Sequence, residues 1–139
     1  MTAYLLFHSQ TSGWGREYSW IDKWASFAGL KPVVIDPQRK RNEDPNQAPL
    51  VFWTMKDALA SPLFEDVQWI YFDPNSRLFL DELEHPSGDV VYALGSDYFG
   101  FGVTELPEGI SVAVRGLPET WAGMCVPCLA YDIIVKGAK

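Results

Sequence analysis

A short apolar run in the second half of the chain ends in a cluster of glycines. Val90–Leu94 leads directly into Gly95, and further glycines follow at Gly100 and Gly102, with Ser96 and an acid between them. Glycine adopts positive φ and lets the backbone approach a ligand closely, because no side chain intervenes. The pattern predicts a buried strand that opens into a loop whose main-chain groups bind a small molecule. A glycine-rich turn that merely leaves the strand is the alternative.

A second loop of this kind precedes the last helical pattern. Arg115–Thr120 contains a glycine, a proline and a threonine that can cap a helix. Both loops follow apolar runs typical of strands, and loops at the carboxyl ends of parallel strands meet at one edge of a sheet. We therefore expect the two loops to flank a common site.

Cys125 and Cys128 form a C-x-x-C pair, which raises the possibility of thiol redox chemistry. Too few residues follow the pair to build the sheet that such a redox motif precedes. Zinc would need two further ligands, and His8 and His85 stand far apart in the sequence, so we expect no metal site. The two cysteines are interpreted as small buried apolar residues, with redox activity as a minor alternative.

The two histidines receive different interpretations. His8 ends the first apolar run beside a polar loop, where it would either touch a substrate or simply finish the strand. His85 precedes Pro86 in an acidic segment and is interpreted as part of an exposed turn.

Composition indicates one domain spanning residues 1–139, in a chain with 47% hydrophobic residues and room for a substantial core. No apolar run is long enough to cross a bilayer, and no basic region precedes the first apolar run, so we expect a cytoplasmic protein without membrane contact. The net charge of −7 argues against attraction of nucleic acid to the whole surface, and DNA is not an expected partner. RNA would bind locally through Arg39, Lys40 and Arg41, although a solvated loop also explains this cluster.

The elements that must position these loops alternate between strand and helix patterns. This alternation predicts an α/β fold with a mostly parallel sheet covered by helices on both faces. A long polar loop runs to Pro49, and Pro127 predicts a late start or a kink in the last helix. Strands are expected at Ala3–Phe7, Pro32–Ile35, Gln68–Phe72, Val90–Leu94 and Ser111–Val114, and helices at Glu17–Ala28, Met55–Ala60 and Glu119–Val135.

Aromatic residues recur along the first helical pattern. Trp20, Trp24 and Phe27 stand at helical spacing, with Ile21 and Ala28 beside them. We predict that this face packs against the sheet as core.

Several of these segments resemble the SPOUT methyltransferases, in the branch that methylates ribose 2′-hydroxyls of RNA. Leu94–Phe101 is similar to the glycine-containing loop of that family, and Trp24–Leu30 to its first helix and the following turn. Ser111–Gly116 and Ala122–Ile134 resemble its final strand, cofactor loop and last helix. Tyr131 and Asp132 stand where the family usually has tyrosine and glutamate.

The resemblance implies an S-adenosylmethionine-dependent methyltransferase of tRNA or rRNA, with a C-terminal trefoil knot from about Ser87 onward. It also implies a homodimer in which the C-terminal helices pack together, with Trp121 or Tyr131 at the interface. The cofactor would be held mainly by main-chain groups at Leu94, Gly95, Gly100, Val114, Arg115, Leu117 and Met124.

The chain departs from the family at positions that matter for chemistry. Lys23 stands where an arginine of the first helix usually helps to activate the hydroxyl, which keeps a charge and loses a planar donor. Arg16 is the second candidate catalytic cation. The serine-x-asparagine pattern before the last helix is missing, and Asp97 replaces a glutamate. A catalytically inert binding or regulatory protein on the same scaffold is therefore the main alternative.

Overall fold

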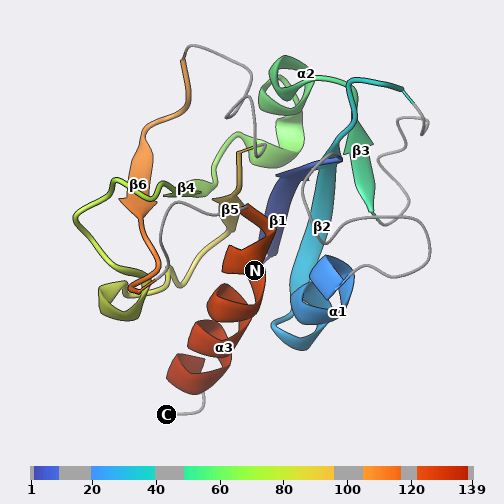
Figure 1. The fold of residues 1–139 in the computed structure, drawn as a ribbon. Helices are drawn as coiled ribbons and strands as arrows, with labels where there is room; N and C mark the ends of the chain where they lie inside the picture. The colour runs from blue at the N-terminus through green and yellow to red at the C-terminus, as the bar shows by residue number, and fades with distance from the viewer. Residues whose placement is uncertain (1, 10–19, 40–48, 96–104, 117–121, 138–139) are drawn as a thin grey trace.

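A six-stranded parallel sheet forms the centre of the molecule (Figure 1). The computed structural model describes residues 2–9, 20–39, 49–95, 105–116 and 122–137. Every pair of neighbouring strands is parallel, which confirms the predicted α/β fold class. The sheet order is β3-β2-β1-β5-β4-β6, with β1 at Ala3–His8, β2 at Leu30–Ile35, β3 at Leu50–Phe52, β4 at Gln68–Phe72, β5 at Val90–Ala93 and β6 at Gly109–Val112.

Helices cover both faces of this sheet, as predicted. On one face α1 and α3 pack beside each other, and η2 packs near α3; α2 and η1 contribute to the core of the other face. None of the helices in the described part of the chain is long and apolar enough to cross a membrane. The helical segments are α1 at Trp20–Phe27, α2 at Met55–Leu59, η1 at Pro62–Phe64, η2 at Leu80–Glu82, η3 at Ala122–Met124 and α3 at Cys125–Gly137.

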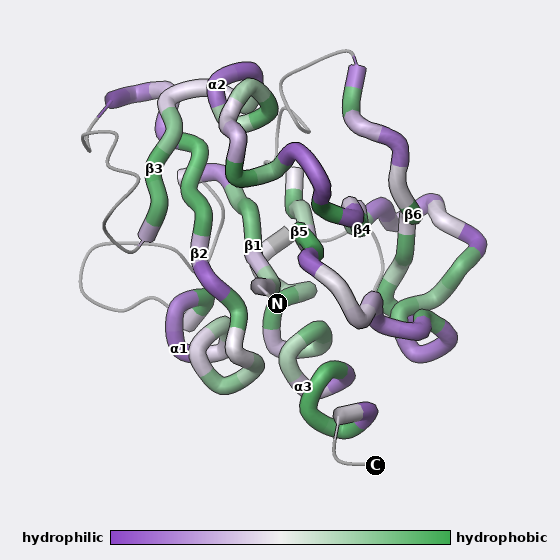
Figure 2. Tube along the Cα trace, turned by 180° about the vertical axis from the view of Figure 1, so that it is seen from behind, coloured by the Kyte–Doolittle hydropathy of each residue, from purple (hydrophilic) through white to green (hydrophobic). Residues whose placement is uncertain are grey.

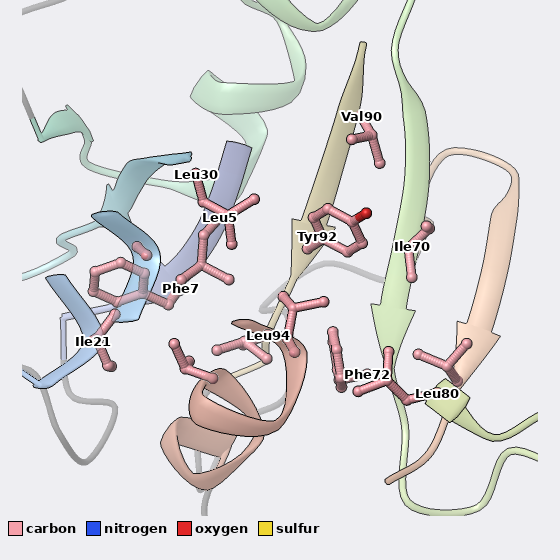
Figure 3. Close-up of a cluster of buried hydrophobic side chains, with 14 of the residues drawn as sticks. Leu5, Phe7, Ile21, Leu30, Ile70, Phe72, Leu80, Val90, Tyr92 and Leu94 are labelled. Atoms are coloured by element: carbon pink, nitrogen blue, oxygen red, sulfur yellow. The ribbon is translucent and has the colours of Figure 1, made fainter. Parts of the chain in front are cut away.

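The inner strands β1, β4 and β5 are apolar on both sides because each side faces a layer of the core. In β1, Leu5 and Phe7 point to the α1/α3 layer, whereas Tyr4 and Leu6 point to the α2 layer. The hydropathy colouring of Figure 2 shows β1 and β3 largely in green, as expected for buried strands. Figure 3 shows the core under α1 and α3, where side chains from several strands meet, among them Leu5, Phe7, Ile70, Tyr92 and Leu94.

Several elements differ from the sequence-based expectations, among them β2, which begins at Leu30, two residues before its predicted start. β3 follows the long polar segment and was not expected, because three residues are too few to show a period. β6 begins at Gly109, two residues before the predicted start. The last helix begins late, at Cys125, so Pro127 lies in its first turn, where the missing N–H group costs no helical hydrogen bond. This late start confirms the expectation drawn from Pro127.

The aromatic stripe of α1 is exposed, and its prediction as core was wrong. The exposed fractions are 40% for Trp20, 36% for Trp24 and 71% for Phe27, whereas Ile21 and Ala25 are fully buried. Consecutive residues of a helix are rotated by about 100°. The stripe of Trp20, Trp24 and Phe27 is therefore distinct from the stripe that begins at Ile21, and the smaller residues of the second stripe let α1 approach the sheet.

Candidate functional site at the carboxyl edge of the sheet

The predicted site strand is β5, and it ends at the carboxyl edge of the sheet, where the other parallel strands also end. Leu94, just beyond β5, is buried, and its N–H donates a hydrogen bond of 2.8 Å to the carbonyl of Leu6 in β1. Gly95 follows and is partly buried. The chain thus leaves β5 at the centre of this edge, with Gly95 as the last described residue of the predicted binding loop.

The segment after β6 reaches the same edge, beyond β4. Ala113 donates to the carbonyl of Leu78 at 2.9 Å and accepts from the N–H of Leu80 at 2.8 Å. Val114 is partly buried against the core, and Gly116 has φ +82°, a conformation that favours glycine at a chain reversal. The structure therefore places Val114 near the edge, separated from Gly95 by the width of β4.

The starts of α1 and of the C-terminal helix meet at one corner of the molecule. The indole N–H of Trp20 donates a hydrogen bond of 3.5 Å to the carbonyl of Gly123 in η3. Met124 follows and is 40% exposed. Lys23 lies three residues after Trp20, on the same side of α1, and is exposed. Lys23 and Met124, predicted for catalysis and cofactor binding, are thus brought to the same corner.

The side chain of Arg115 is directed toward η2. Its Nε lies 3.2 Å from both carboxylate oxygens of Asp81, its Nη2 lies 3.5 Å from a carboxylate oxygen of Glu82, and its Cζ lies 4.1 Å from the ring centroid of Phe79. The hydrogen bond from Arg115 lowers the pKa of the exposed Asp81 carboxyl below its ordinary value. A cofactor contact at Arg115 would therefore come from its main chain.

The other predicted site residues lie outside the described part of the chain: Arg16, Lys40, Arg41, Gly100, Leu117 and Trp121. The same holds for most of the two loops beside the predicted knot, at 96–104 and 117–121. Their roles, and the knot, stay predictions.

One acidic residue at this edge was missed by the sequence analysis. Asp36 directly follows β2, is only 2% exposed, and its N–H donates to the carbonyl of Phe52 at 2.7 Å. Among the described residues it is the only charged side chain in the buried class. An acid directly after the run Val33–Ile35 was the available signal. His8 ends β1 beside Ile35 on this edge, and either of its two interpretations fits this position.

The cysteine pair shows features of inert thiols. Neither Cys125 nor Cys128 forms a disulfide, and both are partly buried near the start of α3. Burial raises the pKa of Cys125 to about 11 and also raises the pKa of Cys128. No cluster of three potential metal ligands occurs within the described ranges. These findings agree with the interpretation as apolar packing residues.

His85 belongs to a partly buried polar network, and its interpretation as an exposed turn residue was wrong. Its Nδ1 lies 2.7 Å from the hydroxyl oxygen of Tyr92, and its Nε2 lies 2.6 Å from Oδ2 of Asp132. Lys136 contacts the same carboxylate oxygen at 2.8 Å and donates to the carbonyl of Leu83 at 2.6 Å. Burial raises the pKa of Tyr92. The network joins α3 to η2 and β5, through partners that local sequence around His85 does not indicate.

Comparison with known proteins identifies the fold. No family model and no curated protein matches the sequence. Two solved structures align with nearly the whole chain. An rRNA methyltransferase from Sinorhizobium meliloti has a TM-score of 0.65 at 12% identity over 97% of this chain. A protein studied for the 2-OH methylation of C/U34 on tRNA has a TM-score of 0.58 at 16% identity over 99% of it. The chain has the α/β fold of these proteins, which is consistent with the SPOUT-like fold that the sequence resemblance implies.

The extent of the two alignments differs. The SPOUT-like chain spans 56% of the Sinorhizobium protein and 92% of the tRNA-modifying protein. Both alignments indicate a fold shared over nearly the whole of this chain. Functional conclusions for this SPOUT-like chain depend on its own residues, because function resides in sites that folds carry and not in folds themselves.

Proposed function

We propose that this SPOUT-like protein is an S-adenosylmethionine-dependent RNA methyltransferase that modifies a ribose 2′-hydroxyl of tRNA or rRNA in the cytoplasm. One observation carries the proposal. Segments that are distant in the sequence, namely Leu94–Gly95, Val114–Gly116 and η3 with the start of α3, lie toward one edge of a SPOUT-like sheet. Two of the solved structures that align with the chain are described as RNA-methylating proteins, which supports the choice of reaction.

The described residues at this edge fit the predicted cofactor. A nucleoside site needs apolar walls with a few well-placed polar groups, many of them from the main chain. Val114 and Met124 have partly exposed apolar side chains, and the side chain of Leu94 is buried beneath the edge. Gly95 exposes main-chain atoms that no side chain covers. We propose that these residues, with Gly100, Leu117 and the main chain of Arg115, bind S-adenosylmethionine. The cofactor would supply an electrophilic methyl group.

Lys23 and Arg16 are the proposed cations beside the reacting hydroxyl. The ribose hydroxyl would have to give up its proton to a base, such as a water molecule, as it takes up the methyl group that the cofactor would supply. A nearby cation lowers the pKa of a hydroxyl because it stabilises the anion. Lys23 lies one turn after Trp20, whose indole N–H donates a hydrogen bond to the carbonyl of Gly123 in η3, and this supports a role for Lys23 near the proposed methyl donor. Arg16, which precedes α1 in the sequence, would add a second donor.

We further propose that the protein is a homodimer through α1 and α3. These neighbouring helices carry exposed apolar side chains, and contiguous exposed apolar surface marks interaction sites. The outermost are Phe27 in α1 and Tyr131 in α3, with exposed fractions of 71% and 69%. The other members of this set are Trp20, Trp24, Ile134 and Val135.

A catalytically inert scaffold is the second candidate, favoured by Arg115. Its guanidinium is engaged by Asp81 and Glu82, and the first helix carries Lys23 in place of the family arginine. Such a protein would retain the fold and transfer no methyl group to RNA.

Titration with S-adenosylmethionine and S-adenosylhomocysteine by calorimetry tests the proposal. We expect micromolar or tighter binding, which corresponds to at least about 8 kcal/mol. Gly95→Val should abolish binding and leave the protein folded, because the side chain would occupy the main-chain approach. Gly88→Val is the matched control, since a Cβ at Gly88 meets no atom within 4 Å. Absence of binding at millimolar ligand would overturn unaided methyl transfer, and binding without transfer to any RNA would favour the scaffold.

A further inference from the structure

Arg39 and Trp53 form a cation–aromatic pair at the carboxyl edge, on the side of the sheet away from β6. The guanidinium carbon of Arg39 lies 4.5 Å from the ring centroid of Trp53. Arg39 is exposed and Trp53 is partly exposed. The pair therefore presents planar, positively charged and aromatic surface to solvent.

Both members of the pair are held by the backbone. Arg39 closes a turn in which its N–H donates to the carbonyl of Asp36 at 3.1 Å. Trp53 stands between the end of β3 and Thr54, which caps α2 by accepting a hydrogen bond of 3.1 Å from the N–H of Asp57. The backbone of Trp53 is therefore fixed on one side by β3 and on the other by the capped start of α2.

The turn at Arg39 is strained. Among the described non-glycine residues, Arg39 alone has positive φ, at 55°. Left-handed backbone at an ordinary residue costs at least as much free energy as an exposed cation–aromatic contact returns. Strain of this kind is concentrated at functional sites.

The location relates the pair to the proposed methyl-donor site. β3 and β5 are separated by β2 and β1, so the pair lies about 14 Å from Gly95, three strand spacings along the same edge. A short run of nucleotides bridges such a distance. Proteins recognise unpaired RNA by stacking its bases on aromatic rings and on arginine planes. Bases inside a duplex are already stacked and do not offer a face.

We propose that Arg39 and Trp53 form a stacking platform for an unpaired base of the RNA substrate. The inference rests on the proposed function and specifies its substrate class: RNA whose nucleotides near the modified ribose are single-stranded, in a loop or at an end. Arg39 contributes a planar cation that covers the base, and Trp53 supports the guanidinium from below. Both are binding residues, not catalytic ones.

Binding of two fluorescently labelled RNAs tests the platform: a stem-loop with an unpaired loop and a fully paired duplex of the same length. Trp53→Leu keeps apolar bulk and should lower affinity for the stem-loop about tenfold, within the range for loss of one stacked base. Arg39→Lys keeps the charge but loses the plane that covers the base, and it should cause a loss of similar size. Arg77→Lys applies the same exchange at another exposed arginine and should change nothing.

Salt dependence separates stacking from phosphate contact. Trp53→Leu should leave the slope of log affinity against log salt unchanged, because an indole releases no counterions, whereas loss of a phosphate contact lowers the slope by about one. Native affinity in Trp53→Leu, an equal loss on the duplex, or no binding of the stem-loop by the native protein would each overturn the platform. Calorimetry with S-adenosylmethionine on the same variants should be unchanged, so failure of the methyl-donor site is seen separately.

Discussion

Arg115 and Asp81 give a prediction at the scale of single residues. Arg115 lowers the pKa of the Asp81 carboxyl below its ordinary value of 3.8. The Asp81 carboxyl therefore binds a proton more readily in the unfolded chain than in the folded one. The contact with Arg115 stabilises the fold at pH values above the ordinary pKa of Asp81, and this stabilisation disappears as pH falls through the lower pKa of the folded state. An NMR titration of Asp81 should show a midpoint below 3.8, and Arg115→Gln should raise that midpoint. An equal midpoint in both proteins would contradict the contact.

The thiols give a second prediction at this scale. With a pKa of about 11, Cys125 is a thiolate in only about one molecule in a thousand at pH 8, and the thiolate is the reactive form. Iodoacetamide should therefore modify native Cys125 slowly at pH 8 and faster as pH approaches 11. The urea-unfolded protein, as the control, should react readily at pH 8. Rapid native modification, or a mass loss of two hydrogens under mild oxidation, would instead support the redox alternative.

Functional residues were recognised from the sequence where the features that mark them are adjacent in the chain, and they were missed where their partners are distant in the sequence. The glycine that follows β5 was evident, because an apolar run and its break are adjacent in the chain. His85 was misread, since one of its partners, Asp132, is 47 residues away. Trp53 was likewise not recognised as a candidate binding residue, because its partner Arg39 lies before a polar segment that shows no helical or strand period.

At the scale of elements, β6 depends on a glycine at its first residue. A Cβ at Gly109 would collide with the carbonyl of Trp69 and lie 2.8 Å from the Tyr71 ring. Backbone cannot yield as a flexible side chain does, so Gly109→Ala should destabilise the protein by about 1–3 kcal/mol. Urea denaturation measures the change. Gly88→Ala, at an open position, should alter the free energy of unfolding by less than about 0.5 kcal/mol, and equal effects at both glycines would refute the close approach.

Element types were easier to predict than element faces. Most of the strands were recognised because strands buried on both sides are continuous apolar runs. The face of α1 was misassigned because two stripes, one of large aromatic and one of smaller residues, run side by side over eight residues. Size alone does not decide which stripe is buried. The helix packs through Ile21 and Ala25, and its tryptophans are left partly exposed.

At the scale of the whole molecule, the parallel sheet follows from the alternation of strand and helix patterns. The gathering of the site segments follows in turn, because parallel strands end at one edge. Tertiary topology beyond this, including the predicted knot and the approach of Arg16, depends on loops that follow no periodic pattern. The sequence therefore predicts where a ligand would bind more firmly than which side chains act on it.

The exposed apolar side chains of α1 and α3 give the last prediction, which concerns assembly. Phe27→Glu or Tyr131→Glu should convert a dimer into a monomer in sedimentation experiments, because each places a charge in the centre of the proposed interface. Leu63→Glu is the matched control, an apolar residue 42% exposed in η1, on the opposite side of the sheet. It should leave the dimer intact.

Stability separates loss of assembly from loss of fold. Substitutions at exposed sites of a monomer change the free energy of unfolding by less than about 0.5 kcal/mol. A dimer instead becomes more stable as protein concentration rises, because association favours the folded state. The native protein and Leu63→Glu should therefore show a concentration-dependent melting temperature, and Phe27→Glu and Tyr131→Glu should not. A native protein that sediments as a monomer at all concentrations would refute the interface and assign the exposed aromatic residues of α1 to another partner.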